Sequence, residues 1–201
     1  ARMIAERLGF DYLDTGAYYR AVGLKLRDAG FDGDALDEDI SKVLKSTVVD
    51  FDRSNKRFYL DGRDVTDAIR TKDAGRYSSI FSKKKSVRDF LLLIQRRFAD
   101  NADLVAEGRD MGTVVFPNAW KKIFLTADVY CRASRRYEQF KEMGSTVTEA
   151  DALTDLVVRD KLDEERQLAP LKKASDAFLL DTSKLSVDDT VAAILRFIDY
   201  R

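Results

Sequence analysis

Apolar residues recur along the chain at two spacings, one typical of helices and one typical of strands. In the first eight residues, Met3, Ile4 and Leu8 follow helical spacing, and Gly9 comes next as a helix C-cap. The apolar stretch that ends at Asp14 predicts a short strand. By these criteria the predicted helices cover residues 1–8, 16–29, 34–45, 71–79, 87–98, 130–143, 148–168 and 187–200, and the predicted strands cover 10–14, 103–110, 121–128 and 177–183.

Residues 46–66 have a different pattern, in which apolar and polar side chains alternate around a turn at Ser54 and Asn55. This alternation predicts an antiparallel hairpin or meander inserted into the chain. Elsewhere buried strands alternate with helices, which predicts an α/β fold with a parallel sheet covered by helices on both faces. Ligands of such sheets bind at the carboxyl ends of the strands. In this chain those ends are Asp14–Thr15, Glu107–Asp110 and Asp128.

The composition narrows the possible function classes. The 35 Lys and Arg residues are balanced by 35 Asp and Glu residues, which argues against a general nucleic-acid or membrane-surface binder. We find no stretch with the pattern of a signal peptide or a membrane-spanning helix. The chain has one cysteine, Cys131, and so no disulfide within the chain. Both observations fit a protein of the reducing cytoplasm, which is the location that we expect. The chain has no histidine, which excludes Ser-His-Asp hydrolases, Cys-His proteases and His-ligated zinc sites. Phosphoryl transfer suits the remaining side chains, because its catalysis is mostly positioning and charge neutralisation.

Five stretches carry side chains suited to phosphate chemistry. LDTGAYYR follows a predicted strand and begins a helix, whose free amides attract an anion. A predicted strand ends in the stretch AEGRDMGTVVFP, which contains Glu107 and Arg109. A carboxylate at this place can hold magnesium through water, and an arginine can bind a phosphate. RDKLDEER puts Arg159, Asp163 and Arg166 on one face of a predicted helix. The candidates of the other two stretches are Arg132, Arg135 and Arg136, and Arg70, Ser79 and Arg88. Taken alone, each stretch also fits a structural role as a cap, a turn or a salt-bridged helix face.

In their order along the chain, these stretches resemble the bacterial cytidylate kinases. LDTGAYYR is followed by IRT, then by EGRDMGTVVFP, and then by RDKLDEER before LAPL. The phrase GRDMGTVVFP is particularly specific to that family, and the resemblance covers essentially the whole chain, including the β insert. It implies a P-loop kinase with a three-layer parallel sheet and helices on both faces. It also implies an inserted CMP-binding subdomain at about residues 42–80 and a helical lid at about residues 130–168.

The resemblance further implies transfer of the γ-phosphoryl group of ATP to CMP or dCMP, with Mg²⁺ accompanying ATP. The residues that would hold the CMP phosphate are Arg20, Arg109 and Arg166. Those that would read the cytosine are Ser79, Arg88 and Asp110, and those on the sugar side are Arg159 and Asp163, with Thr15 near the substrate. Arg109, Arg159 and Arg166 are the expected catalytic residues. Arg132, Arg135 and Arg136 resemble lid-side arginines that approach ATP, and Glu107 would hold magnesium through water.

One element of the family pattern, the glycine-rich loop GxxxxGK[ST] that wraps the ATP phosphates, does not occur in this sequence. In the family it lies just upstream of the helix that begins here at Ala1. We therefore expect residues upstream of Ala1, and we expect a chain that starts at Ala1, without the loop and the first sheet strand, to be inactive. A smaller departure is Glu107, where many relatives carry Asp.

Two alternatives stay open at this point. One is a non-catalytic nucleotide-binding protein that kept the CMP pocket and lost the phosphate loop. The other is a related kinase for UMP, AMP or shikimate, which the β insert and the cytosine-reading residues disfavour. We expect a monomer whose partners are CMP or dCMP and ATP, with no nucleic-acid or membrane partner.

Overall fold

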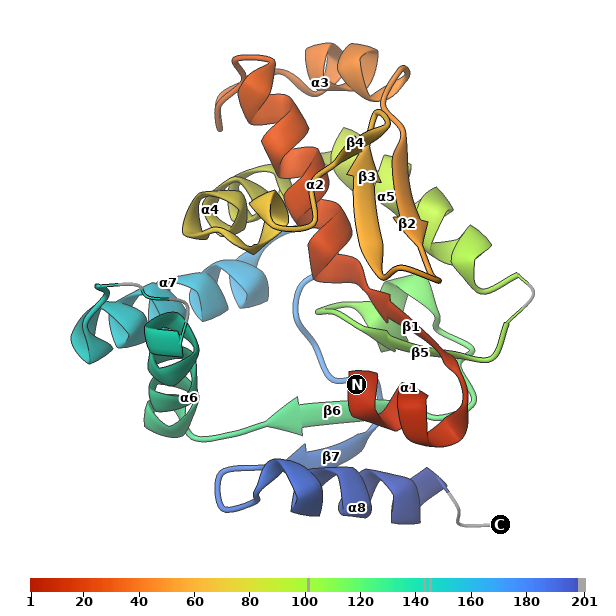
Figure 1. Ribbon diagram of the computed structural model, residues 1–201, viewed down its shortest axis with the longest axis vertical. Coiled ribbons are helices and arrows are strands. Elements are labelled where there is room, and N and C mark those ends of the chain that lie inside the picture. The colour runs from red at the N-terminus through yellow and green to blue at the C-terminus, as the bar shows by residue number, and fades with distance from the viewer. Residues whose placement is uncertain (101, 143, 145, 199–201) are drawn as a thin grey trace. The chain divides into compact units, whose positions relative to one another are not determined.

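The computed structural model describes residues 1–100, 102–142, 144 and 146–198. The chain divides into two compact units, each described by itself (Figure 1). Unit 1 consists of residues 1 and 9–108, and unit 2 consists of residues 2–8 and 109–201.

Unit 1 combines a parallel pair of strands, a small antiparallel sheet and a set of helices. Its strands are β1 (Asp11–Asp14), β2 (Val49–Asp52), β3 (Arg57–Leu60), β4 (Arg63–Asp64) and β5 (Leu104–Glu107), and its helices are α2 (Thr15–Asp28), α3 (Asp37–Leu44), the 3₁₀ turn η1 (Ala68–Arg70), α4 (Lys72–Phe81) and α5 (Lys85–Phe98). β1 and β5 pair in parallel, in a register that sets Asp14 opposite Glu107. Both strands therefore present their carboxyl ends, and an acidic residue each, at the same edge.

The junction between β1 and α2 follows from the sequence LDTG. The Asp14 side chain caps α2 by accepting a hydrogen bond from the amide of Ala17 at 3.0 Å. At the other end of α2, Gly30 takes a positive φ of 81° and its amide donates to the carbonyl of Arg27, a helix ending that glycine adopts without strain. The buried side of α2 includes Tyr18 and Val22, which belong to the core of unit 1.

The antiparallel sheet packs on the rest of unit 1 through aromatic side chains. β2 pairs with β3, and β3 pairs with β4, so the three strands form a meander. Phe58 of β3 contacts Tyr18 of α2 edge-on, with ring centroids 5.2 Å apart. Phe51 of β2 lies 4.6 Å from Phe58 and 6.4 Å from Phe98 of α5. These contacts fix the insert to α2 and α5.

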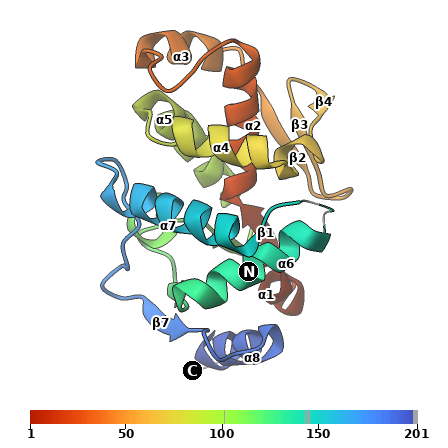
Figure 2. The ribbon, with the colours of Figure 1, turned by 90° about the vertical axis from the view of Figure 1, so that its left-hand side faces the viewer.

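Helices α2 and α4 cross at close range, as the view of Figure 2 shows. Gly23 of α2 makes this approach possible, because a Cβ atom at Gly23 would lie 2.8 Å from the amide nitrogen of Ser78. Ser79, a predicted substrate-binding residue, is the next residue of α4. The absence of a side chain at Gly23 thus sets how closely the Ser79 helix lies against α2.

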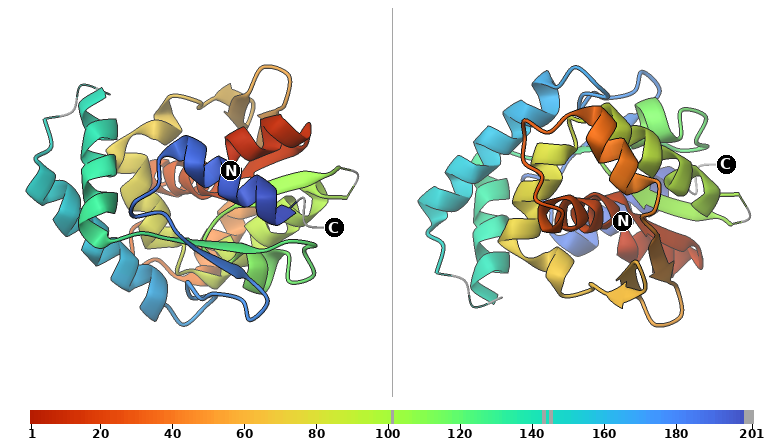
Figure 3. Two further views of the ribbon diagram at one scale, coloured as in Figure 1. Left: turned by 90° about the horizontal axis from the view of Figure 1, so that it is seen from below. Right: turned by 90° about the horizontal axis from the view of Figure 1, so that it is seen from above.

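Unit 2 contains a second parallel pair of strands and four helices in the described residues. Its elements are α1 (Arg2–Leu8), a single π-helical turn η2 (Met111–Val115), β6 (Ile123–Thr126), α6 (Val129–Glu142), α7 (Glu149–Glu165), β7 (Phe178–Asp181) and α8 (Val187–Ile198). β6 and β7 pair in parallel, from Ile123 opposite Phe178 to Thr126 opposite Asp181. α1 lies beside α8 (Figure 3), and α6 lies beside α7 (Figure 2).

The helices of unit 2 begin and pack for identifiable reasons. The Thr148 hydroxyl and the Asp151 carboxylate exchange hydrogen bonds with each other's main-chain amides, a capping box that starts α7. The rings of Phe178 in β7 and Phe197 in α8 stack with centroids 4.5 Å apart. None of the helices in the described ranges is both long and apolar enough to cross a membrane.

The structure confirms the predicted α/β class with parallel strands, and it corrects several element boundaries. The helix predicted from residue 34 begins at Asp37, because the Asp32 side chain accepts the amide of Asp34 in a turn. The helix predicted to reach residue 168 ends at Glu165, and Arg166 follows with an extended ψ of 138°. β5, predicted to be buried, is only half-buried and ends with exposed Glu107. The predicted ends of two helices, at residues 143 and 200, lie outside the described residues.

We predict that Gly23→Ala lowers the free energy of unfolding by about 1–3 kcal/mol, because the new methyl group meets the α4 backbone, which cannot move as a side chain would. Urea denaturation measures the change. Gly75→Ala in α4 is the matched control: its Cβ would meet nothing within 4 Å, so removing a helical glycine should stabilise the protein by about 0.5–1 kcal/mol. A Gly23→Ala protein as stable as the parent would refute the packing account.

Candidate functional site

The carboxyl edge of the β1–β5 pair gathers polar side chains in unit 1. The Tyr12 hydroxyl donates a hydrogen bond to Oε1 of Glu107. The Thr15 hydroxyl donates to the main-chain carbonyl of Glu107 at 2.7 Å, and Thr15 is only 2% exposed. Thr15 and Glu107, both predicted from the sequence, therefore lie together, and Tyr12, which bonds the Glu107 side chain, was not predicted. Burial, followed by the hydrogen bond to the Glu107 carboxylate, raises the pKa of the Tyr12 phenol.

An arginine from the end of the β insert lies over the same edge. Nη1 of Arg70 is 3.6 Å from Oδ2 of Asp14, while Oδ1 of Asp14 caps α2. Half of the Arg70 side chain is exposed, so the pair adds little to stability. The pair nevertheless places Arg70, the cation of the IRT stretch, beside Asp14 of the LDTG stretch.

The other predicted residues of unit 1 lie on three helices. Arg20 is on α2, Ser79 on α4 and Arg88 on α5. Arg88 is buried, its Nε donates to the Ser82 carbonyl at 2.8 Å, and its guanidinium lies 5.7 Å from the centre of the Tyr19 ring. A buried arginine held at one nitrogen by a carbonyl has a fixed plane, which suits a residue that reads a flat base.

In unit 2 the structure brings together Arg109, Asp163 and Arg166. Nε of Arg109 donates to Oδ2 of Asp163 at 3.0 Å, and Nη1 of Arg166 donates to Oδ1 at 3.2 Å. One carboxylate thus orients two guanidinium groups, one per oxygen. The Arg109 side chain is 47% exposed, whereas that of Arg166 is 5% exposed.

The chain after α7 folds back to complete this cluster. Nε of Arg166 donates to the Ala169 carbonyl at 2.7 Å, and the amide of Leu171 donates to the Asp163 carbonyl at 2.8 Å. Ala169 has a positive φ of 48°, which an alanine adopts only when its surroundings enforce it. Arg166 therefore reaches Asp163 from the loop just past the helix, and not from the helix face that the sequence predicted. Arg159 lies on α7 one turn before Asp163.

Asp110, the predicted cytosine reader, is the N-cap residue just before the π-helical turn η2. It is 5% exposed, and its carbonyl accepts the amides of Val114 and Val115 at 2.9 and 3.2 Å. The strand predicted over residues 103–110 therefore ends at Glu107, and this turn follows it. Wide turns of this kind are rare and are often found at functional sites.

The three arginines predicted to approach ATP all lie on α6, but their surroundings differ. Nε of Arg132 donates to the Ala127 carbonyl at 3.0 Å, and its Nη1 pairs with Asp160 of α7. Arg135 donates to the carbonyls of Thr182 and Leu185, at 2.7 and 3.2 Å, in the loop after β7. Arg136 lies 4.7 Å from the centre of the Phe140 ring. Asp160 was not recognised from the sequence, where it reads only as part of a mixed charge run.

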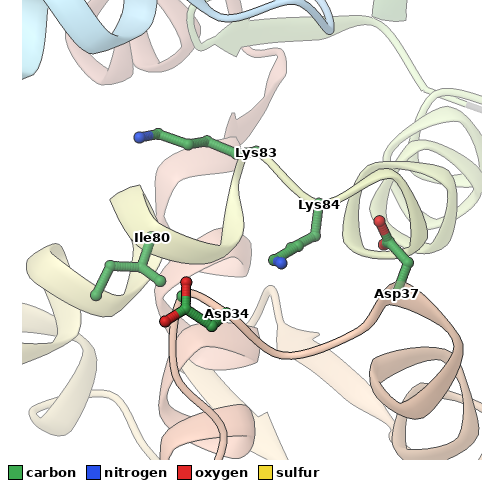
Figure 4. A pocket seen from close by; sticks show the side chains of 6 residues that line it. Asp34, Asp37, Ile80, Lys83 and Lys84 are labelled. Carbon is green, nitrogen blue, oxygen red and sulfur yellow. The ribbon is translucent and has the colours of Figure 1, made fainter.

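A pocket of about 430 Å³ in unit 1 contains none of the predicted residues. Its lining residues are Gly33, Asp34, Asp37, Ile80, Lys83 and Lys84 (Figure 4). The Asp37 carboxylate accepts the amide and hydroxyl of Ser86, at 2.9 and 2.5 Å, at the start of α5, and Lys84 donates to the Ala35 carbonyl. Burial acts to raise the pKa of Asp37, but these hydrogen bonds outweigh it and lower the pKa. Asp37 and Lys84 are thus bonded to Ser86 and Ala35, which lie outside the lining, as expected of a structural contact.

Glu107 is the residue that the sequence predicts to hold magnesium through water. Its carboxylate is a hard oxygen donor, and Oε2 has no hydrogen-bond partner within the part of the chain that the structure describes. The described residues contain no cluster of three or more acidic or cysteine side chains that could hold a metal directly. A single carboxylate suits Mg²⁺, which keeps most of its water ligands and binds beside substrate phosphates.

The comparison with known proteins supports the resemblance seen in the sequence. The sequence profile described as "Cytidylate kinase" matches residues 1–200. The chain belongs to the cytidylate kinase family. A cytidylate kinase of Thermosipho melanesiensis is 46% identical over 198 residues, which cover 98% of this chain and 89% of that protein. Cytidylate kinases of Thermodesulfovibrio yellowstonii and Thermotoga maritima are 44% and 41% identical over 200 and 201 residues, covering 98% and 100% of this chain and 89% and 90% of theirs.

Family membership confirms the predicted kinase class, and the protein is a phosphotransferase. The particular site residues stay predictions. Unit 1 brings Thr15 and Glu107 together, and unit 2 brings Arg109, Asp163 and Arg166 together. The insert at about 42–80 lies in unit 1 and the segment at about 130–168 lies in unit 2. Their roles as CMP-binding subdomain and lid are likewise still predictions.

We predict that Asp163→Ala lowers the free energy of unfolding by about 1.5–3 kcal/mol, because the buried Arg166 guanidinium loses its charged acceptor. Chemical denaturation of this cytidylate kinase measures the loss. Glu164→Ala, an exposed neighbour on the same helix, should stay within about 0.5 kcal/mol of the parent. Equal effects of the two substitutions would show that Asp163 does not stabilise the cluster.

Proposed function

We propose that this cytidylate kinase transfers the γ-phosphoryl group of ATP to the phosphate of CMP or dCMP, and that Arg109 and Arg166 hold the acceptor phosphate. The observation that carries the proposal is the shared carboxylate of Asp163, which orients both guanidiniums. A chain without histidine has no imidazole base, and this reaction needs none, because the attacking phosphate oxygen is already ionised.

The chemistry explains why arginines are used. CMP carries about two negative charges and must meet a further anion, the triphosphate of ATP, so cations have to offset the repulsion. Each charge-assisted hydrogen bond contributes about 1.5–3 kcal/mol. Arginine adds direction to charge, because its planar fork fixes the angle of the phosphate oxygens. Arg20 is the third proposed phosphate ligand, and Arg159 and Asp163 serve the sugar side.

Base selection is proposed to depend on Ser79, Arg88 and Asp110. Cytosine carries an amino group at C4, which can donate a hydrogen bond to a carboxylate such as that of Asp110. Uracil carries a carbonyl oxygen at this position, which cannot donate one. Arg88 and Ser79 supply donors for the ring nitrogen and carbonyl of cytosine. The buried position of Arg88 supports this role, because its guanidinium is held by the Ser82 carbonyl and the Tyr19 ring.

On the donor side we propose Arg132, Arg135 and Arg136 as ATP-side residues and Glu107 as the acid that orients magnesium through water. Bound magnesium would neutralise phosphate charge as it develops. The hydrogen bonds of Arg135 to the loop after β7 also hold α6 against that loop.

The two alternatives are not favoured. The relatives over nearly the full length are cytidylate kinases, which argues against a kinase dedicated to UMP, AMP or shikimate. The same matches argue against a non-catalytic fragment, because the substrate motifs are present in the expected order.

A substrate panel tests the proposed base selection. We expect the full-length protein to phosphorylate CMP and dCMP at least about tenfold faster than UMP or AMP, since a site built to hydrogen-bond the substrate rejects an analogue that leaves a polar group unpaired. A coupled ADP-release assay at fixed Mg-ATP measures the four rates. Equal rates on all four nucleotides would remove the base-reading assignment.

Arg109 offers a cleaner test of phosphate binding than Arg166, because its side chain is half-exposed and its loss should disturb folding less. We expect Arg109→Met to lower kcat/KM for CMP by about tenfold or more, while the urea midpoint stays close to that of the parent. The matched control is Arg196→Met on α8, which removes an exposed arginine of the same unit. Arg109 would be excluded from the site if its variant turned over CMP like the control.

A further inference from the structure

Glu107 is held at two points by one short segment of unit 1. The Tyr12 hydroxyl donates to its side-chain Oε1, and the Thr15 hydroxyl donates to its main-chain carbonyl at 2.7 Å. In the parallel register Tyr12 lies opposite Val105, and Asp14 lies opposite Glu107. The phenol therefore reaches diagonally across the ladder, toward the carboxyl end of β5, a distance that suits a long side chain.

This restraint matters because a glutamate has three side-chain torsions. An exposed glutamate normally samples many rotamers, and ordering it costs free energy each time that it must bind a partner. A hydrogen bond from a phenol at Oε1 removes much of this freedom before any ligand arrives. Within the described residues the second oxygen, Oε2, has no hydrogen-bond partner, so it is the oxygen available to a water of a metal ion.

We propose that Tyr12 is a positioning residue for magnesium: its hydroxyl holds the Glu107 carboxylate so that Oε2 faces the water shell of the ion bound with ATP. The inference rests on the proposed role of Glu107. Outer hydrogen bonds of this kind orient the groups that bind a metal, and their loss typically lowers metal affinity. Tyr12 itself touches neither metal nor nucleotide in this account.

If Tyr12 had only a structural role, the expected effect of removing its hydroxyl would be different. Its ring would support the β1–β5 pair by packing, and the four-residue main-chain ladder would persist without the hydroxyl. Tyr12→Phe keeps the ring and removes only the donor. A structural role therefore predicts an unchanged response to magnesium, whereas a positioning role predicts a changed one.

The experiment measures binding of a non-hydrolysable ATP analogue to the full-length protein by calorimetry, once with Mg²⁺ and once with EDTA. The ratio of the two affinities reports the magnesium contribution and needs no turnover. We expect Tyr12→Phe to lower this ratio by about tenfold while the affinity in EDTA is unchanged. Glu107→Gln should lower it at least as much, and the double variant no further than Glu107→Gln alone. Tyr59→Phe in β3 is the matched control and should keep the parental ratio.

Each other outcome overturns a defined part of the account. A parental ratio in Tyr12→Phe, with a lowered ratio in Glu107→Gln, would reject the positioning role and leave Glu107 in place. A parental ratio in Glu107→Gln would reject the magnesium role of Glu107 and, with it, that of Tyr12. Losses that add in the double variant would show that Tyr12 acts independently of Glu107. The CMP kinase activity is judged separately by the substrate panel, so its failure is distinguishable from all of these.

Discussion

An arginine binds a phosphate with two parallel hydrogen bonds at a lower entropic cost when its guanidinium plane is already oriented, and several acceptors in the described structure provide this orientation. Asp163 orients Arg109 and Arg166, Asp160 orients Arg132, and the Ser82 carbonyl orients Arg88. Holding a long side chain in advance reduces the entropy lost when the ligand binds. A chain without histidine relies on such fixed cations for its chemistry.

The acidic side chains at the β1–β5 edge are also held in place by hydrogen bonds. At the β1–β5 edge, Asp14 caps α2, and Glu107 is held by Tyr12 and Thr15. Asp14 and Thr15 are adjacent in sequence, but Asp14 bonds the first turn of α2 whereas Thr15 bonds the end of β5. The segment LDTG therefore combines two tasks: it starts the helix that carries Arg20, and it fixes the end of β5. This explains why so short a motif is informative about function.

Much of this architecture was predictable from sequence, since local patterns determine it. The helix C-caps at Gly9 and Gly30 and the alternation in residues 46–66 were sufficient to place α1, α2 and the meander. Contacts between distant residues were not predictable. Tyr12 and Glu107 are 95 positions apart. The sequence around Gly23 gives no sign that the α4 backbone packs directly against this glycine. The end of α7 was misplaced because the chain turns back after Glu165, with a positive φ at Ala169 and a bond from the Leu171 amide to the Asp163 carbonyl, and no glycine or proline directly follows Glu165 in the sequence to mark this ending.

The central claim is that arginines from separate stretches of this cytidylate kinase bind one nucleotide phosphate. A crystal structure of the full-length protein with CMP tests it most directly. The account predicts that the guanidiniums of Arg20, Arg109 and Arg166 lie within hydrogen-bond distance of the CMP phosphate oxygens, with Asp163 still bonded to Arg109 and Arg166. A CMP phosphate bound by other side chains, with these three arginines directed elsewhere, would contradict it.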